Sequence, residues 1–302
     1  MKRLPQIALL PDGKRLHLQD GPIDLIVEAK GGEGDVRAAY EAAARRFTGL
    51  LDELCEELVE LRTAADPVRC KLEGVVARRM HAAVAPFAAD HFITPMAAVA
   101  GSVAEEILGA MLGPARLERA YVNNGGDIAL HLGAGEQFTV GLMDRPDRQG
   151  LMRTIAIEAD DPVRGIATSG RHGRSFSLGI ADAVTVLART ASKADAATTI
   201  IANAVDLPGN PAIVRCPATE LQPDSDLGSR LVTRDVGALR ESEVDTALRA
   251  GASRAQQLLV AGLIEGAALR LLGETVLVGA TGIRTQAFPA FHGNAIQRVM
   301  HV

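Results

Sequence analysis

The chain has 302 residues, of which 47% are hydrophobic and 23% charged, and its formal net charge is −5. These proportions are typical of a globular protein with a substantial core. An acidic chain without a long basic run is poorly suited to binding a phosphate backbone, so we expect no nucleic-acid partner. The three cysteines, Cys55, Cys70 and Cys216, form no CxxC pair, which argues against a disulfide framework or a zinc site.

The N-terminal apolar run from Ile7 to Leu10 is shorter than the core of a signal peptide and is bracketed by Pro5 and Pro11. No run of consecutive apolar residues approaches the roughly 18 expected of a membrane span. We therefore expect a cytoplasmic protein with no membrane partner.

The first part of the chain predicts strands followed by helices. Asp12-Gly13 is a hairpin signal and residues 24–28 form a strand core. After the glycine-rich residues 31–34, apolar residues at three- and four-residue spacing predict one long helix. They are Phe47, Leu50, Leu51, Leu54, Leu58 and Leu61.

Two more helices follow, one with an apolar face from Leu72 to Phe87 and one from about Pro95 to Leu112. Small residues from Ala97 to Ala104 would let another backbone or a flat ligand approach the second of these closely.

From about Leu117 the pattern changes to strands. We expect them at residues 120–122, 127–132, 137–143, 153–158 and 182–188, and then a helix at 193–205 and a surface stretch at 206–228. A helix at 243–262 and strands at 267–272 and 275–278 complete the series. The predicted helices cluster early in the chain, the strands lie in the middle, and there is no sustained βαβ alternation. This order predicts an α+β fold with a mostly antiparallel sheet. With no evident linker, residues 1–302 are expected to form a single domain.

The first candidate site segment joins two predicted strands, from Asn123 to Asp127. Gly125 and Gly126 permit positive φ and leave backbone N–H groups open to a ligand. Asn124 and Asp127 flank them with side chains that can form hydrogen bonds. A plain hairpin turn with Asx caps is the alternative.

The second segment runs from Gly165 to Arg174. Thr168, Ser169 and Gly170 end a strand, and the positive charge comes from Arg164, Arg171, His172 and Arg174. This composition suits an anionic group such as a diphosphate, because arginine can donate bidentate hydrogen bonds to phosphate oxygens. A solvated loop whose arginines pair with surface carboxylates is the alternative.

The third segment runs from Ala194 to Thr199, at the start of a predicted helix. Asp195 and Thr199 lie one turn apart on the same face and can contribute oxygen ligands to a hard cation such as Mg²⁺. The alternative is that Asp195 is a helix N-cap. No pattern identifies a catalytic residue.

Together the three segments resemble the FAD:protein FMN transferase (ApbE-like) superfamily, and among its members an uncharacterised shortened branch. That superfamily carries an N-x-GGD-type turn, an A-T-S-G segment and an A-D-x-x-x-T helix start, which stand here at Asn124–Asp127, Ala167–Gly170 and Ala194–Thr199. The resemblance implies a T-fold-like domain in which long helices pack against the sheet.

The resemblance also implies a small-molecule nucleotide ligand, FAD or FMN, bound with Mg²⁺ that Asp195 and Thr199 hold in part. Met96 and Gly101 of the third helix would flank the flavin ring, while Ser169, Gly170, Arg171 and the glycine turn would contact phosphate. T-fold-like proteins often assemble through sheet edges, so a homo-oligomer is expected.

Two departures from the superfamily bear on activity. Residues 99–106 (VAGSVAEE) contain no lysine where the transferases carry a G-x-x-K-G-type segment, and a stretch ending in D-P-x-T-G is missing before Asp182. These departures argue against transfer of FMN onto a protein threonine. They leave two hypotheses: a Mg²⁺-dependent activity on a flavin nucleotide or similar diphosphate, or a ligand-binding or assembly protein that has lost FMN transfer.

Overall fold

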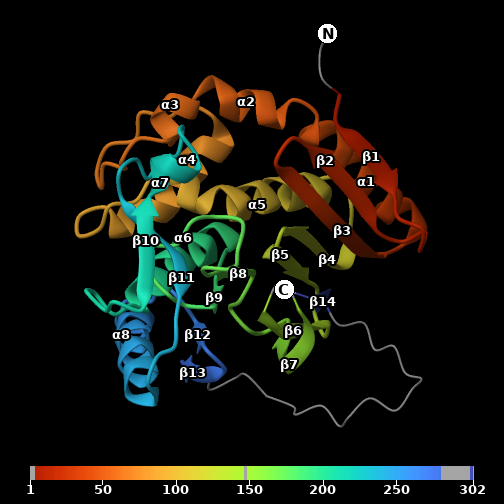
Figure 1. Cartoon of the computed structure of the whole chain (residues 1–302). Helices are drawn as coiled ribbons and strands as arrows, with labels where there is room; N and C mark the ends of the chain where they lie inside the picture. The colour runs from red at the N-terminus through yellow and green to blue at the C-terminus, as the bar shows by residue number, and fades with distance from the viewer. Residues whose placement is uncertain (1–3, 146–147, 280–299, 302) are drawn as a thin grey trace.

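A computed structural model describes residues 4–145, 148–279 and 300–301 of the chain, with backbone alone described for 142–145, 148–153 and 300–301. Within this part, nine strands form one sheet in the order β1-β2-β3-β4-β5-β8-β9-β12-β13 (Figure 1). All of its neighbouring strands pair antiparallel. The strands are β1 Gln6–Leu9, β2 Leu16–Asp20, β3 Ile23–Gly31, β4 Leu117–Asn124, β5 Asp127–Leu132, β8 Gly165–Ser169, β9 Ala183–Ala188, β12 Gly266–Leu271 and β13 Glu274–Val278.

Two small sheets accompany the large one. One contains β6 (Gln137–Arg145), β7 (Arg148–Glu158) and β14 (Met300–His301), and the other contains β10 (Ile213–Pro217) and β11 (Leu231–Val236). The helices are α1 Glu33–Phe47, α2 Leu50–Glu56, α3 Leu58–Leu61, α4 Val75–Val84, η1 Ala85–Phe87, η2 Pro95–Ala98, α5 Val99–Leu112, α6 Ala191–Ala204, α7 Ala218–Leu221 and α8 Glu241–Val260.

The large sheet separates two hydrophobic cores. Helices α1, α5, α6 and α8 cover one face, while β6 and β7 pack over the other. Successive residues of a strand point to opposite faces: on β5, Ala129 belongs to the helical core, whereas Ile128 and Leu130 belong to the second core. The predicted α+β class with a mostly antiparallel sheet is confirmed.

The prediction of one long helix through Leu61 was wrong. The helix ends at Phe47, and α2 and α3 follow as separate short helices. Gly49 has φ = 87°, a left-handed conformation that stops the helix. Phe47, Leu50, Leu54 and Leu61 are nevertheless all buried, so the apolar stripe was correctly identified although the backbone turns within it.

The prediction for residues 206–228 was also incomplete. This stretch contains β10 and the short helix α7, and β11 follows it. The two strands pair with a register shift between Val214 and Arg215, and such an irregular, half-exposed ribbon has a weak period-two pattern.

One described stretch, Pro95–Leu112, is long and apolar enough by length and composition to cross a membrane. The sequence expectation overlooked it. Half of this stretch is buried inside the fold, where α5 packs against α1, α4 and α6 as a core helix does.

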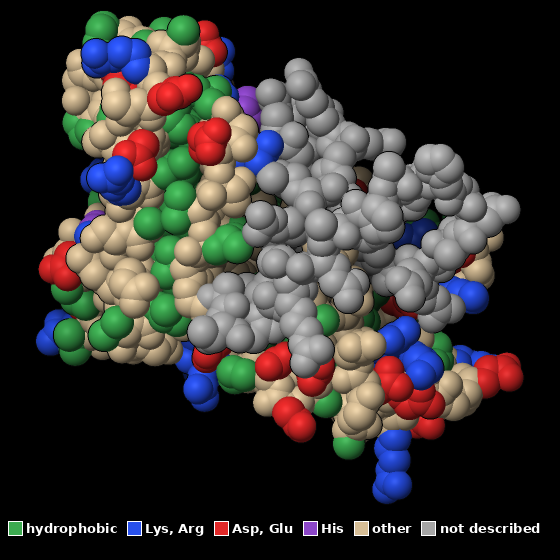
Figure 2. All heavy atoms as spheres, turned by 90° about the horizontal axis from the view of Figure 1, so that it is seen from below, with side chains coloured by type: hydrophobic (Ala, Val, Ile, Leu, Met, Phe, Trp, Pro, Cys, Tyr) green, Lys and Arg blue, Asp and Glu red, His purple; other side chains and the backbone are tan. Residues whose placement is uncertain are grey.

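On the lower face of the molecule, acidic and basic side chains are intermixed over the described residues (Figure 2).

Helices α5 and α6 approach each other closely at Gly101. A Cβ atom placed there would lie 2.4 Å from the carbonyl oxygen of Ala191 and 2.8 Å from the amide nitrogen of Ser192. The small residues of α5 therefore accommodate another backbone, which was one of the two possibilities that the sequence left open.

We expect Gly101→Ala to destabilise the protein by about 1–3 kcal/mol, because the methyl group meets backbone that cannot move aside. Gly109 lies on the same helix, and a Cβ atom placed there would have nothing within 4 Å, so Gly109→Ala should instead stabilise by about 0.5–1 kcal/mol. Urea unfolding of both variants measures the difference. Equal effects of the two substitutions would contradict the close contact.

Candidate functional site

The Asn124–Asp127 segment is a two-residue hairpin between β4 and β5. Asn124 and Asp127 form the last pair of the ladder, and Gly125 and Gly126 have φ values of 64° and 111°. The amide of Gly126 donates to Oδ1 of Asn123 at 2.8 Å. The hairpin with an Asx contact is therefore real, and its positive φ values explain why both central residues are glycine.

The hairpin also meets helix α5. Nδ2 of Asn124 donates to the carbonyl oxygen of Ala100 at 3.2 Å, and Asn124 is buried. On the neighbouring strand β8, the amide of Thr168 donates to Oδ1 of Asp127 at 3.2 Å. At this turn the first and second candidate segments therefore meet each other and helix α5.

Asp195 brings the third segment to the same place. It lies on the second turn of α6, is 9% exposed, and accepts a 3.0 Å hydrogen bond from the amide of Gly101 through Oδ2. The N-cap alternative was wrong: α6 begins at Ala191, and its N-cap is Thr190, whose hydroxyl accepts from the amide of Lys193. The carboxylate of Asp195 is directed at α5 instead.

Asp127, which is half-buried, and Asp195, which is buried, form an acidic pair. Burial raises the pKa of Asp127 well above its ordinary value, and the negative charge of Asp195 raises it further, while the Thr168 amide and Arg174 act in the opposite sense. Burial also raises the pKa of Asp195 to about 7, against the lowering effect of the amides of Gly101 and Ala100. Two carboxylates that repel each other in a desolvated site favour a proton or a cation between them.

Thr199 lies one turn after Asp195, as predicted, but its hydroxyl donates to the backbone carbonyl of Asp195 at 3.3 Å. Its oxygen keeps acceptor capacity. In η2, Met96 is half-buried and packs against the helical core. Ser169 ends β8 and is also half-buried, and Gly170 packs against backbone, since a Cβ there would lie 2.4 Å from the carbonyl oxygen of Asp182.

The basic residues of the second segment separate into different roles. Arg171 and His172 both contact the carboxylate of Asp182, and Arg164 donates to backbone carbonyls, including that of Ala159. Arg174 instead lies over the hairpin, where its guanidinium would occupy the space of a Cβ on Gly125. Of these four side chains, Arg174 is the one placed beside the acidic pair.

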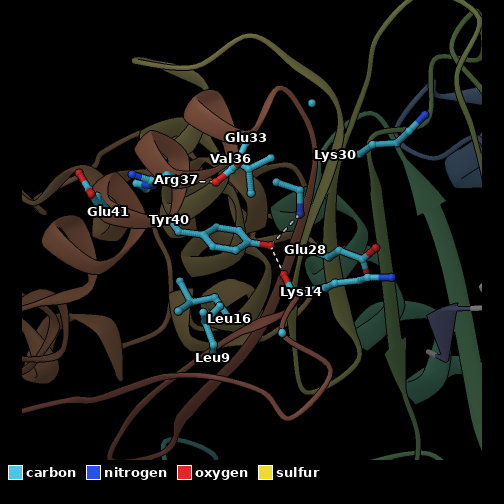
Figure 3. Close-up of a pocket in the computed structure, with 13 residues that line it drawn as sticks. Leu9, Lys14, Leu16, Glu28, Lys30, Glu33, Val36, Arg37, Tyr40 and Glu41 are labelled. Carbon is cyan, nitrogen blue, oxygen red and sulfur yellow. Dashed lines mark hydrogen bonds and ion pairs between the residues drawn. The ribbon is translucent and has the colours of Figure 1, made fainter.

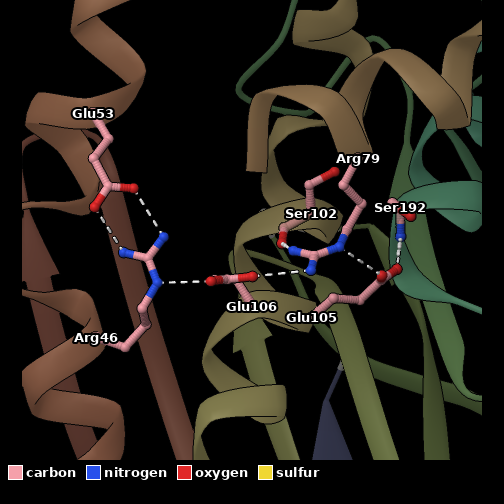
Figure 4. Close-up of polar contacts among 7 residues, drawn as sticks. All are labelled: Arg46, Glu53, Arg79, Ser102, Glu105, Glu106 and Ser192. Carbon is pink, nitrogen blue, oxygen red and sulfur yellow. Dashed lines mark hydrogen bonds and ion pairs between the residues drawn. The ribbon is translucent and has the colours of Figure 1, made fainter. Parts of the chain in front are cut away.

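A chain of ion pairs holds the helices around this site (Figure 4). Glu106 accepts hydrogen bonds from Arg46 at 2.6 Å and from Arg79 at 2.9 Å. Burial alone would raise the pKa of Glu106, but these two arginines bring it below its ordinary value. Glu105, the residue before Glu106, accepts a hydrogen bond from the amide of Ser192 at 2.6 Å.

The contact to Ser192 and the contact between Gly101 and Asp195 join α5 to the first two turns of α6. Sequence reasoning missed this network. Its charged residues look like ordinary helix-surface charges, and no spacing rule connects α1, α4 and α6.

A separate pocket of about 610 Å³ lies between α1 and strands β1–β3 (Figure 3). Leu16, Val36 and the ring of Tyr40 contribute to its apolar lining. The hydroxyl of Tyr40 accepts from the amide of Ala29 at 3.1 Å and donates to the carbonyl of Lys14 at 2.5 Å. None of the predicted site residues lines this pocket, which lies at the Gly31 end of β3, whereas the glycine hairpin lies beside Leu25.

Comparison with known proteins gives three findings. Residues 7–277 match the model of the protein family described as "AbpE bacteria". A UPF0280 protein of Methanopyrus kandleri is 41% identical over 143 residues, which are 47% of this chain and 54% of that protein. A UPF0280 protein of Archaeoglobus fulgidus is 34% identical over 143 residues, 47% of this chain and 55% of that protein. The matches span about half the length of these curated relatives.

Among solved structures, the apo form of the flavinyl transferase ApbE of Pseudomonas stutzeri matches with a TM-score of 0.45 and 11% sequence identity. That match covers 91% of this chain and 95% of the other.

The raised pKa values of Asp127 and Asp195 predict that the folded protein becomes less stable as the pH rises. A carboxyl group whose pKa is higher in the folded than in the unfolded state binds its proton more tightly when folded. Stability is therefore highest below the ordinary value of 3.8 and falls as the pH rises towards about 7. For one proton the slope approaches 1.4 kcal/mol per pH unit.

We expect the free energy of unfolding, measured in urea without divalent cations, to fall less steeply between pH 5 and 7 in Asp195→Asn than in the wild type. Asp245→Asn, which changes an exposed carboxylate on α8, is the matched control and should keep the wild-type slope. The same slope in Asp195→Asn and the wild type would contradict the raised pKa.

Proposed function

Because the chain belongs to the family described as AbpE bacteria, we propose that it binds a flavin nucleotide, or a similar nucleotide diphosphate, together with Mg²⁺ at the acidic pair. The observation that supports this most directly is the position of Asp127 and Asp195. They come from a strand and a helix far apart in the sequence, Asp195 is buried and Asp127 half-buried, and both have raised pKa values. A divalent cation between them would let both carboxylates ionise.

The donor set fits Mg²⁺ in a particular way. The described residues contain no group of three or more His, Cys, Asp or Glu side chains placed to hold a metal, so the protein would supply two carboxylates. Mg²⁺ commonly takes its remaining oxygen ligands from water and from substrate phosphates. The bound ion would neutralise phosphate charge and orient the phosphate group. The hydroxyl of Thr199, one turn after Asp195, would add a neutral oxygen ligand.

The phosphate would lie between the acidic pair and Arg174. Arg174 offers a planar set of donors over the glycine hairpin, and the absence of side chains at Gly125 and Gly126 leaves the turn open. Since Arg171 is held by Asp182, we assign the phosphate contact to Arg174 rather than to Arg171. Ser169 at the end of β8 and the amides of the hairpin complete this proposed subsite, with Met96 towards the flavin ring.

A second function, ligand binding without FMN transfer, is favoured by a specific observation. Residues 99–106 contain no lysine, and the Gly101 position is filled by the backbone of α6. A side chain at Gly101 would have to displace the packing that orients Asp195. The chain would then bind the ligand without transferring FMN.

Isothermal titration with FAD, with and without Mg²⁺, tests the proposal, alongside chromatography for released FMN and AMP. We expect Mg²⁺-dependent binding in the wild type and at least about tenfold weaker binding in Asp195→Asn, a loss of about 1.4 kcal/mol. Asp245→Asn is the control and should bind as the wild type does.

Released FMN and AMP would support an enzyme, whereas tight binding without products would support the second function. No binding of FAD by the folded wild-type protein, with or without Mg²⁺, would overturn the flavin proposal. A homo-oligomer, a single domain over residues 1–302 and a cytoplasmic location stay predictions.

A further inference from the structure

Asp182 lies outside the acidic pair but is a centre of contacts for the loop that carries Arg174. This loop connects β8 to β9, from Gly170 to Asp182, and Asp182 stands at its far end. The residue is 5% exposed. A buried carboxylate is costly unless it is paired and fully hydrogen-bonded, and the contacts of Asp182 meet that condition.

The carboxylate of Asp182 reaches back across the loop to its beginning. Oδ1 lies 2.8 Å from Nε and 2.7 Å from a terminal nitrogen of Arg171, and 3.2 Å from Nε2 of His172. The backbone follows the same path: the amide of Arg171 donates to the carbonyl of Ala181 at 2.9 Å. The two ends of the loop are therefore joined by both backbone and side chains, three residues before Arg174.

The other carboxylate oxygen holds a different part of the fold. Oδ2 accepts a 2.5 Å hydrogen bond from the amide of Leu272, in the turn between β12 and β13. Leu272 has φ = 47°, a left-handed conformation that is strained for a residue with a bulky side chain. The amide of Asp182 in turn donates to the carbonyl of Arg270 at 2.9 Å.

The second half of the loop is fixed by other contacts. The amide of Leu178 donates to Oδ1 of Asn203 at 3.0 Å, and the amide of Ile180 donates to the carbonyl of Val205 at 2.8 Å. These contacts join residues 178–180 to the end of α6. In the first half, the amide of Gly173 donates to the carbonyl of Gly170 at 3.0 Å, and the contact of Arg171 with Asp182 is the charged one.

We propose that Asp182 is a positioning residue: through Arg171 it fixes the 170–174 segment so that the Arg174 guanidinium lies over Gly125, and it links this arrangement to the β12–β13 turn. The consequence for ligand binding rests on the proposed function, whereas the consequence for the position of Arg174 does not. The strained turn at Leu272 and the phosphate contact would then depend on the same carboxylate.

The first test follows Arg174 without any ligand. In protein labelled with ¹⁵N-arginine, the Nε signal of Arg174 is assigned by its loss in Arg174→Lys, and its order is measured by the heteronuclear NOE. We expect Asp182→Asn to shift this signal and to reduce its NOE, because asparagine keeps an acceptor but loses the charge that holds Arg171. Arg171→Gln should act alike and serves as a second variant should Asp182→Asn fold poorly.

The matched control is Glu265→Gln, which breaks the ion pair of Glu265 with Arg189 and should leave the Arg174 signal unchanged. An unchanged signal in folded Asp182→Asn or Arg171→Gln would overturn the proposal.

The second test separates positioning from general destabilisation through a double-mutant cycle on FAD affinity. Asp182→Asn should weaken binding about tenfold in the wild-type background and have no further effect in an Arg174→Ala background. Equal weakening in both backgrounds would show that Asp182 does not act through Arg174. If the wild type binds no FAD, the proposed function fails, and the NMR measurement alone decides the role of Asp182.

Discussion

The close approach of α5 to the first turns of α6 is the constraint on which the site depends. Gly101 allows it, because any side chain there would meet the backbone of Ala191. Once the helices are this close, the amide of Gly101 reaches Asp195 and Glu105 reaches the amide of Ser192. Asn124 then attaches the glycine hairpin to the carbonyl of Ala100. One backbone contact thus determines where a carboxylate from a helix and a carboxylate from a strand stand relative to each other.

The arrangement is electrostatically unfavourable in the absence of a cation. A buried and a half-buried carboxylate lie close enough to raise each other's cost of ionisation, and the nearby groups that favour their charged forms are backbone amides and Arg174. Structural ion pairs elsewhere in the fold look different: Glu106 lies between two arginines that lower its pKa, and Asp182 is surrounded by donors. Two neighbouring carboxylates whose ionised forms are poorly compensated, unlike those of Glu106 and Asp182, are typical of functional sites.

Local patterns in the sequence identified most of the elements and the three segments that the fold brings together. Period-two alternation found β5 and β12, and the paired glycines at 125–126 indicated a turn that requires positive φ. The failures have physical causes. Gly49 ends a helix within an apolar stripe that continues without interruption, and the pairing of β10 with β11 has weak alternation. The roles of Asp195 and Arg171 depended on partners distant in the sequence, Gly101 and Asp182, which no spacing rule supplies. Arg171 and Arg174 are the same residue type three positions apart. The sequence could therefore not tell which arginine Asp182 holds and which lies over the hairpin.

The loop between β8 and β9 bears differently on the proposed binding and on transfer. The groups proposed to hold the ligand, namely Asp127, Asp195, Arg174 and the glycine hairpin, lie on elements joined by hydrogen bonds and close packing, so this half of the site is preorganised. Binding needs no more than such a rigid arrangement. Transfer would also need groups that strengthen their contacts in the transition state. The segments where the resemblance to the transferases breaks down, residues 99–106 and the loop before Asp182, pack against backbone at Gly101 and Gly170. A side chain at Gly101 would displace the helix that carries Asp195, and one at Gly170 would displace the strand that begins after Asp182. The two glycines therefore constrain the positions of the residues proposed to bind the ligand, whether or not any transfer takes place.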